Sequence, residues 1–393
     1  MVIAAGYRAV PDEQYVPGRG AGARIGVAAI REAIVCALTS GLGVFHVHLH
    51  DHAGIPSFSM TDRVEQTRLV QSLHAAQPTQ PHGMIVVSAD GANAWIWMPG
   101  ETTPSVPARL ALVGYPMRLQ LGESLRMGGS AHQASETTDR YSRQSFLGPA
   151  SEAQFASVRI GLLGFGGGGS HVGQQIAHLG VENIRVADGD RIDESNLNRL
   201  VGATADDVDA RRIKVEIASR IASAVNRSVN IMTHEGPWQQ RAELFRSSDI
   251  IVGCVDSFAQ RQEAEVLARR FAIPYIDIGM DVHQVGDDPP RIGGQLILSM
   301  PGGPCMTCLG FLTPDKLARE AARYGAAGGR PQVVWSNGVL ASSAVGVIVD
   351  LVTAWTRTQD RIVYLSYDGN RGTLTDHVRL QHLGWRACPH FPE

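Results

Sequence analysis

The sequence predicts an α/β protein in which a doubly wound, mostly parallel sheet is joined to a smaller α+β domain. From residue 140 onward, apolar strand patterns alternate with amphipathic helical patterns, the first strand runs into four consecutive glycines, and the second ends in Asp188. Such alternation is typical of a parallel sheet with helices on both faces. The 393 residues leave room for two domains, which we place at 1–122 and 140–393 with a polar linker at 123–139.

The composition excludes several functional classes. Hydrophobic residues make up 44% and charged residues 19% of the chain, and the formal net charge is -3. No Lys/Arg-rich run is present, so nucleic acid is not an expected partner. The sequence shows neither an apolar run of about 18 residues, as a membrane span requires, nor a secretory signal. Five cysteines are too few for a disulfide framework, so we expect a cytoplasmic protein.

The elements follow from hydrophobic periodicity. In the larger domain we expect strands at 158–164, 183–188, 228–234 and 274–280. We expect one helix that follows the glycines and ends near 179, and further helices at 210–225 and 258–271. The stretch 243–256 should hold a short helix followed by a strand. In the smaller domain we expect helices at 30–40 and 63–76 and strands at 43–50, 83–89 and 93–100.

The glycine run belongs to the stretch "LGFGGGGSHVG" at 163–173. It follows a strand and opens a helix, which is the context of a phosphate-binding loop. Backbone amides and the helix dipole attract anions there, and Asp188 stands about 20 residues on, where a ribose hydroxyl is bound in dinucleotide sites. These features alone fit a Rossmann-like NAD(P) site as well as an ATP site.

The residues that follow Asp188, together with Arg143 before the glycine loop, favour ATP. Arg199, Lys214 and Arg143 can supply cations for a triphosphate, and Asp256 at a strand end can bind magnesium. Each of these residues has another interpretation by itself. The cations can be solvated surface charges, and Asp256 can cap the helix that follows it.

Together these motifs resemble the ThiF/MoeB/E1 group of adenylating enzymes. They are the "RYSRQ" entry, a GxGGxGS loop, D-x-D, "SNLNR", "KVE" and "CVD", and they cover about residues 138–393. The resemblance implies that a C-terminal carboxylate attacks the α-phosphate of ATP·Mg, which yields an acyl-adenylate and pyrophosphate. It also implies that a ubiquitin-like protein, a sulfur-carrier protein or a precursor peptide is the substrate.

The resemblance also assigns individual residues. It implies ATP contacts from Gly164, Gly166, Gly167, Gly169, Ser170, Asp188, Asp190, Asn196, Arg199 and Lys214. It implies that Asp256 binds Mg²⁺ and that Arg143 reaches the site of the second subunit of a homodimer. The "KVE" continuation favours Lys214 over Arg211 or Arg212, although the stretch after Arg199 is slightly longer than usual.

The cysteines suggest a structural zinc site. Cys305 and Cys308 form a C-x-x-C pair, and Cys388 and His390 lie far downstream. Phe391 occupies the position where similar enzymes carry the fourth cysteine, so His390 is the nearest replacement; buried thiols are the alternative. No cysteine lies between Cys308 and Cys388, so we expect adenylation without an E1-type thioester.

The N-terminal domain carries a histidine-rich strand, "FHVHLHDH". Together with the S-x-x-D that follows, it resembles the JAB/MPN (JAMM) metalloprotease motif, with His48, His50, Ser59 and Asp62 in the best register. The resemblance implies a second zinc site. The family's first strand, which carries the general-base glutamate, is expected to lie before this sequence begins, and neither Glu13 nor Glu32 is well placed to replace that glutamate. A protease with an upstream start, a metal-binding domain and a docking domain all remain open.

We therefore expect an adenylyltransferase that uses ATP and Mg²⁺. One alternative is a non-catalytic scaffold that binds a ubiquitin-like protein. The other is an NAD(P)-binding oxidoreductase. An oxidoreductase would leave five residues without a role: Arg143, Asn196, Arg199, Lys214 and Asp256.

Overall fold

The computed structural model describes residues 1–4, 6–16, 24–122, 139–284, 286–322, 331–384 and 388–391. The chain divides into two compact units, each described here by itself. The first runs to Leu112 and includes Arg118–Gly122, and the second holds Val113–Met117 and the described residues from Asp139 onward. Residues 123–138 of the predicted linker lie outside the described residues.

An eight-stranded sheet forms the centre of the second unit, in the order β10-β9-β8-β11-β12-β13-β14-β15. The strands are β8 (Arg159–Leu163), β9 (Asn183–Asp188), β10 (Asn230–Glu235), β11 (Ile250–Gly253), β12 (Tyr275–His283), β13 (Arg291–Ser299), β14 (Tyr364–Asp368) and β15 (Thr373–Asp376). The pairs from β10 to β12 are parallel and those from β12 to β15 are antiparallel. The predicted α/β fold is confirmed, and the antiparallel strands beyond β12 extend it.

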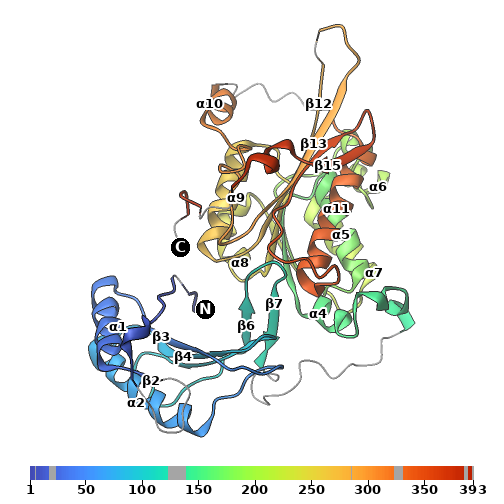
Figure 1. Cartoon of the computed structure of the whole chain (residues 1–393). Helices are drawn as coiled ribbons and strands as arrows, with labels where there is room; N and C mark the ends of the chain where they lie inside the picture. The colour runs from blue at the N-terminus through green and yellow to red at the C-terminus, as the bar shows by residue number, and fades with distance from the viewer. Residues whose placement is uncertain are drawn as a thin grey trace. The chain divides into compact units, whose positions relative to one another are not determined.

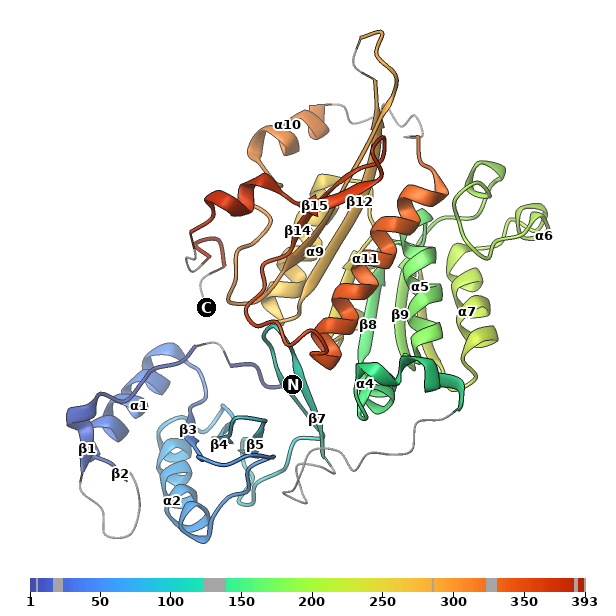
Figure 2. The same ribbon diagram turned by 45° about the vertical axis from the view of Figure 1, so that its right-hand side comes forward.

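Helices cover both faces of this sheet (Figures 1 and 2). They are η2 (Asp139–Leu147), α4 (Ser151–Ser157), α5 (Gly167–Leu179), η3 (Glu194–Asn196), α6 (Ala205–Asp209), α7 (Lys214–Val225), η4 (Trp238–Arg241), α8 (Ala242–Phe245), α9 (Phe258–Arg270), α10 (Pro314–Ala322), α11 (Val334–Thr353) and η5 (Val378–His382). One core contains apolar side chains of α5, α7 and α11, such as Ile176 and Ile348. A second core contains those of α8 and α9, such as Phe245 and Ala264. The sheet is therefore covered on both sides, as the alternating pattern predicts.

The helix predicted at 210–225 begins later, at Lys214. A separate short helix, α6, precedes it and starts with a capping box between Thr204 and Asp207. Arg211 has a φ of 46° between the two helices, a backbone conformation that a continuous helix does not allow. The extra length after Arg199 thus folds into its own turn of helix and leaves Lys214 at the start of α7.

Helix α11 corrects the expectation about apolar runs. Among the described residues it alone is long and apolar enough to cross a membrane, by length and composition only, with a mean hydropathy of 1.4 in its most apolar window. Within the fold, 67% of that window is buried, and the helix packs on α5, β12 and β13. Its apolar composition therefore fits a core position.

The first unit is an α+β arrangement. Its elements are η1 (Asp12–Gln14), β1 (Tyr15–Val16), β2 (Arg24–Ile25), α1 (Val27–Ser40), β3 (Phe45–Leu49), α2 (Met60–Ala76), β4 (His82–Val87), β5 (Ala92–Trp97), β6 (Arg109–Leu112) and β7 (Arg118–Leu121). Strand β4 pairs with β3 in parallel and with β5 antiparallel, and a small core forms around Phe58, Val70 and Met84. The predicted helices and strands of this region are present, with shifted ends.

Candidate active site and metal centres

The glycine loop joins β8 to α5 and is packed tightly on one side. Gly164 has a φ of +94°, and a Cβ there would lie 2.8 Å from the Cys254 carbonyl oxygen. A Cβ on Gly169 would lie 2.2 Å from the Gly164 carbonyl oxygen, whereas one on Gly166 would meet nothing within 4 Å. The loop therefore needs glycine at Gly164 and Gly169 to fold, and Gly166 faces open space beside the N-terminus of α5.

Asp188 ties this loop to the end of the neighbouring strand. Parallel pairing of β8 with β9 brings the two strand ends together. One carboxylate oxygen of Asp188 accepts a hydrogen bond of 2.6 Å from the Phe165 N–H, and the other accepts one of 2.9 Å from the Asp190 N–H. Burial raises the pKa of Asp188 above its usual value. A carboxylate has about four acceptor positions, so Asp188 can still accept ribose hydroxyls.

Lys214 reaches the same strand end from the start of α7. Its side chain is largely buried, and Nζ lies 2.7 Å from Asp190 Oδ2 and 3.9 Å from Asp188 Oδ1. The competing candidate Arg212 instead pairs with Asp207 at 2.8 Å. The structure therefore brings Lys214, Asp188 and Asp190 together beside the glycine loop.

The predicted phosphate contacts Asn196 and Arg199 lie on the segment that follows β9. Asn196 is buried at the end of η3, and its backbone carbonyl accepts the Arg199 N–H at 3.0 Å. The Arg199 guanidinium is half-buried and donates to the Ser195 carbonyl and, at 3.1 Å, to Asn198 Oδ1. Both side chains are thus held on a short turn whose own hydrogen bonds fix its shape.

Two further contacts brace the glycine loop. The buried Ser170 hydroxyl donates to the Gly167 carbonyl at 3.0 Å and accepts the Val201 N–H at 3.1 Å, so it links the loop to the segment behind Arg199. A Cβ on Gly167 would lie 2.4 Å from Asn337 Nδ2 of α11, which therefore covers the loop closely. The direct ATP contacts of Ser170 and Gly167 stay predictions.

Asp256 follows β11 and is exposed to solvent. The alternative that it caps the next helix is wrong, because the N-cap of α9 is Ser257, whose Oγ accepts the Gln260 N–H at 3.1 Å. The backbone N–H groups of Phe258 and Ala259 also have an acceptor, because they donate to the carboxylate of Glu320 on α10. The capping groups of α9 therefore come from Ser257 and Glu320, and the role of Asp256 as a Mg²⁺ ligand stays a prediction.

Arg143 lies far from the glycine loop of its own chain. It is exposed on η2, and the adjacent Gln144 donates at 3.1 Å to the carbonyl of Leu179, the last residue of α5. The glycine loop is at the other end of α5, about 18 Å away at the usual rise per residue. In Figure 2, α4, which follows η2, lies at the lower end of α5. The structure does not bring Arg143 into the site that its own chain forms.

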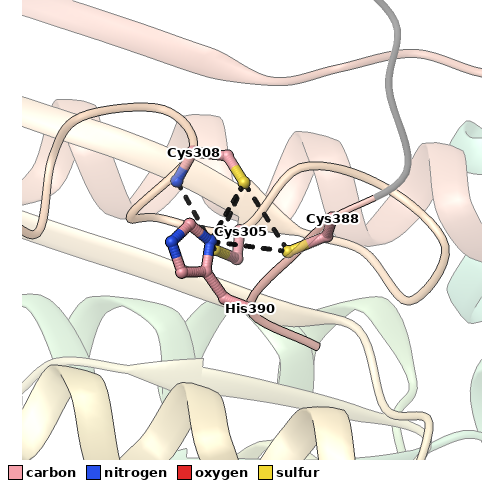
Figure 3. A group of neighbouring side chains, drawn as sticks. All are labelled: Cys305, Cys308, Cys388 and His390. Carbon is pink, nitrogen blue, oxygen red and sulfur yellow. Dashed lines mark hydrogen bonds between the residues drawn. The ribbon is translucent and has the colours of Figure 1, made fainter. Parts of the chain in front are cut away.

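Three cysteines and one histidine converge on one point (Figure 3). Cys308 Sγ lies 3.6 Å from both Cys305 Sγ and Cys388 Sγ, and His390 Nδ1 lies 3.4 Å from Cys308 Sγ and 3.5 Å from Cys305 Sγ. A tetrahedral zinc ion with bonds of about 2.3 Å to sulfur has S···S edges of about 3.8 Å. The donor set and its spacing therefore fit zinc, with His390 as the fourth ligand.

The environment differs among these thiols. Burial raises the pKa of Cys305 to about 12. Burial also opposes ionisation of Cys388, but the backbone N–H groups of His390 and Phe391 stabilise its thiolate and lower its pKa to about 7. A metal ion bound by these residues would supply the positive charge that three neighbouring thiolates require.

The histidine-rich strand of the first unit forms a second cluster. His48 Nε2 lies 3.2 Å from His50 Nε2 and 3.2 Å from Asp62 Oδ1, and His50 Nε2 lies 3.6 Å from Asp62 Oδ2. The Ser59 hydroxyl accepts the Asp62 N–H at 3.1 Å in a capping box at the start of α2. The predicted register is thus the one that the structure brings together. Glu32 is occupied elsewhere, by Gln14 Nε2 at 2.8 Å and Arg8 at 3.0 Å.

The fold and the loop define a nucleotide-binding α/β protein with a buried lysine at the start of α7 and an exposed aspartate after β11. The profile of the ThiF family matches residues 140–385. This chain therefore belongs to the ThiF family.

Two relatives of this chain support the assignment to the adenylyltransferases. The chain is 28% identical to the sulfur carrier protein ThiS adenylyltransferase of Bacillus subtilis, over 64% of this chain and 71% of that protein. It is also 28% identical to the SAMP-activating enzyme E1 of Haloferax volcanii, over 54% of this chain and 76% of that protein. Together with the family, these relatives confirm an adenylyltransferase over the oxidoreductase alternative.

Solved structures confirm the fold. E. coli MccB with MccA-N7isoASN superimposes with a TM-score of 0.50 at 18% identity and covers 63% of this chain and 73% of that one. PaaA superimposes with a TM-score of 0.50 at 20% identity, over 63% of this chain and 85% of that one.

Three residues near the predicted ones were not predicted: Asn337 packs against the glycine loop, Glu265 lies beside the cysteines, and Glu320 accepts the first amides of α9. Only Glu265 has a signal in the sequence. It forms a line of charged residues with Arg261 and Arg269, four positions apart on one helical face.

Proposed function

We propose that this adenylyltransferase activates the C-terminal carboxylate of a small sulfur-carrier or ubiquitin-like protein, or of a precursor peptide. The carboxylate oxygen attacks the α-phosphorus of ATP, the bond from that phosphorus to the bridging oxygen breaks, and pyrophosphate leaves. The observation that carries this proposal is the buried Lys214 held beside Asp188 at the edge of the glycine loop. A C-terminal carboxylate is ionised at neutral pH, so the protein supplies charge and position and no general base.

Each residue has a role in this scheme. The glycine loop and the α5 N-terminus hold the phosphates, Asp188 holds the ribose, and Arg199 and Asn196 face the phosphates together with Lys214. In the structure Lys214 pairs with Asp190, an exposed carboxylate, so phosphate oxygens compete with Asp190 for the ammonium group. Asp256 would hold magnesium, which supplies charge neutralisation on the phosphates.

The acyl-adenylate passes directly to a separate acceptor in this proposal. Cys254 is the thiol nearest in sequence to Asp256, and burial raises its pKa well above the usual value. A buried neutral thiol is a poor nucleophile. The sequence gives a second argument: no cysteine lies between Cys308 and Cys388, so that segment offers no thiol for an E1-type thioester.

A pyrophosphate-exchange assay tests the activity. The chain is mixed with ATP, Mg²⁺ and either a carrier protein that ends in Gly-Gly or candidate precursor peptides. We expect exchange that Lys214→Ala or Asp256→Ala reduces by at least about 100-fold, while Arg211→Ala retains it. No exchange with any substrate class, or full exchange in both active-site variants, would refute the proposal.

We further propose a homodimer in which Arg143 completes the partner's site. Two observations support it: Arg143 lies at the wrong end of α5 for its own site, and the nearby aromatic pair Phe146 and Trp355 is exposed. Mixing Arg143→Ala chains with Lys214→Ala chains then restores one intact site per mixed dimer, or about a quarter of wild-type activity. If Arg143 acts within its own chain, the mixture stays as inactive as its components.

The two side-chain clusters are proposed metal sites. The Cys305, Cys308, Cys388 and His390 set fits a structural zinc ion, and the His48, His50 and Asp62 set offers three ligands with an open position, as in a JAB/MPN domain. Because Glu32 is engaged elsewhere, we propose that the N-terminal site binds metal without cleaving peptides. A cytoplasmic location stays a prediction.

A further inference from the structure

Strand β12 is much longer than its parallel neighbour β11. The two strands pair only where Ile251–Gly253 lie opposite Tyr275–Asp277, whereas β13 pairs with all nine residues of β12. Figures 1 and 2 both show the β12–β13 hairpin projecting past the rest of the sheet. Among the residues that the structure describes, no strand pairs with β12 beyond Asp277 on its β11 side.

The backbone groups on this free side of β12 belong to alternate residues. The Ile251 N–H donates to the Pro274 carbonyl at 3.0 Å, so the carbonyl of Pro274 points towards β11. Because a strand repeats every two residues, the N–H and C=O groups of Ile278, Met280 and Val282 point to the same side. Met280 and Val282 are half-buried and lie beyond the end of β11. Their backbone groups therefore form an edge to which a further strand can add.

This edge leads to the glycine loop. A Cβ on Gly168 would lie 3.1 Å from Ile278 Cδ1, so the Ile278 end of the edge packs beside the start of α5. Arg261 of α9 is buried and donates from Nη1 to the Ile278 carbonyl at 3.2 Å, so it occupies the edge at the same end. An extended chain that pairs with Met280 and Val282 thus ends beside the loop, in line with β11.

We propose that the C-terminal tail of the acyl substrate binds as an added strand along Met280 and Val282, antiparallel to β12. The direction follows from the chemistry, because the terminal carboxylate must reach the nucleotide at the Ile278 end. Two tail residues that are two positions apart then exchange backbone hydrogen bonds with Met280 and Val282, and the residue between them directs its N–H away.

The proposal also specifies the kind of tail. The stretch from Ile278 to Val282 spans about 13 Å, so about four extended residues before the carboxylate are recognised. Proline has no N–H to donate, so a tail with proline at a pairing position binds poorly. This inference rests on the proposed activation of a C-terminal carboxylate.

Met280→Pro tests the edge in the full-length protein. Proline removes the Met280 N–H, which points away from β13, so the β12–β13 ladder keeps its hydrogen bonds. We expect the KM for the acyl substrate in pyrophosphate exchange to rise about fivefold, the factor for one lost hydrogen bond. The kcat, the ATP affinity and the midpoint of urea unfolding should change little. Met280→Leu keeps the N–H and is the matched control; equal KM values in the two variants would overturn the inference.

N-methylated tails test the same hydrogen bonds from the substrate side, and they decide the question if Met280→Pro fails to fold. The probe is a short synthetic peptide that ends in Gly-Gly, with one backbone nitrogen methylated at a time. Weakened binding at two positions with an unaffected position between them is the expected result. A uniform effect along the tail, or none, contradicts an added strand.

Hydrogen exchange at the Met280 and Val282 amides separates this inference from the proposed function. Both amides should exchange quickly in the free protein and slowly with excess Gly-Gly peptide and a non-hydrolysable ATP analogue. Slow exchange in the free protein, or pyrophosphate exchange activity without this protection, overturns the inference. Protection without pyrophosphate exchange activity refutes the proposed function and leaves the inference standing, and the lack of both refutes both.

Discussion

Glu265 on α9 accepts a hydrogen bond of 2.7 Å from the backbone N–H of Met306, which lies inside the turn from Cys305 to Cys308. The Glu265 side chain is 1% exposed, and the Ser299 hydroxyl donates to the same carboxylate oxygen. One turn along α9, Arg269 donates to the Gly303 carbonyl at 2.9 Å. The backbone of the cysteine turn is therefore fixed by side chains of the same helix that starts beside Asp256.

Removing this support should weaken metal binding at the cysteines. We expect Glu265→Ala to lower zinc affinity by about 10- to 100-fold, as for other outer-shell partners of metal ligands, because the turn loses the acceptor that orients Met306. Glu263→Ala, on the exposed side of the same helix, is the control. Zinc transfer to a coloured chelator measures both, and equal transfer rates in the two variants would contradict the prediction.

The glycines of the loop should separate into two classes. Gly164→Ala places a Cβ 2.8 Å from a carbonyl oxygen at a φ of +94°, so we expect it to destabilise the fold by about 1–3 kcal/mol. Gly166→Ala adds a methyl group in open space, so the midpoint of urea unfolding should change little while ATP binding weakens. ATP binding as tight as that of the wild type in Gly166→Ala would mean that this space does not receive the nucleotide.

Stability should depend on pH through Asp207. Arg220 hydrogen bonds to this buried carboxylate hold its pKa well below the usual value, and Arg212 and Thr204 add to the effect. A lowered pKa means that the native state binds fewer protons than the unfolded state, so the stabilisation is complete above about pH 4 and is lost as the pH falls towards the native value.

The variant Asp207→Asn tests this expectation. At pH 7 it should lower the free energy of unfolding by about 3 kcal/mol, because two arginines lose their partner. Urea unfolding at several values between pH 7 and pH 3 should show that the difference from the wild type shrinks with acidification. A constant difference would place the effect of Asp207 in packing and not in charge.

The N-terminal cluster should bind one metal ion of its own. With Cys305 and Cys308 replaced by serine, we expect about one zinc per chain to remain and to disappear in His48→Ala or Asp62→Ala, because each removes one of three ligands. His52→Ala leaves all three ligands in place and should retain the ion. Zinc content by mass spectrometry distinguishes these variants, and zinc retained in His48→Ala would exclude this ligand set.

Much of the candidate site could be predicted from the sequence because its residues belong to short motifs along the chain. Loop glycines after a strand, an aspartate at the next strand end and a C-x-x-C pair are short-range patterns, and the order of parallel strands brings their carboxyl ends to one edge. The structure pairs Arg212 with Asp207 and leaves Lys214 beside Asp188, which favours Lys214 over Arg212, and the contact of Lys214 with ATP stays a prediction.

Contacts between distant segments were beyond the reach of the sequence. Glu320 meets α9 across 62 positions, and Glu265 meets Met306 across 41. These contacts depend on how α10 and the turn from Cys305 to Cys308 pack against α9, and a single sequence carries no periodic signal for that.

By itself the sequence determined the α/β class, the nucleotide loop, the strand-end acids and the candidate metal ligands, since each depends on backbone conformation or on spacing along the chain. Only the tertiary structure decided among the alternatives that the sequence left open: Ser257 and not Asp256 caps α9, Arg143 lies at the far end of α5, and His390, the expected fourth ligand, lies beside Cys305 and Cys308. These three outcomes depend on which side chains meet after packing, because a carboxylate, a guanidinium or an imidazole acquires its role from the partners within a few ångströms.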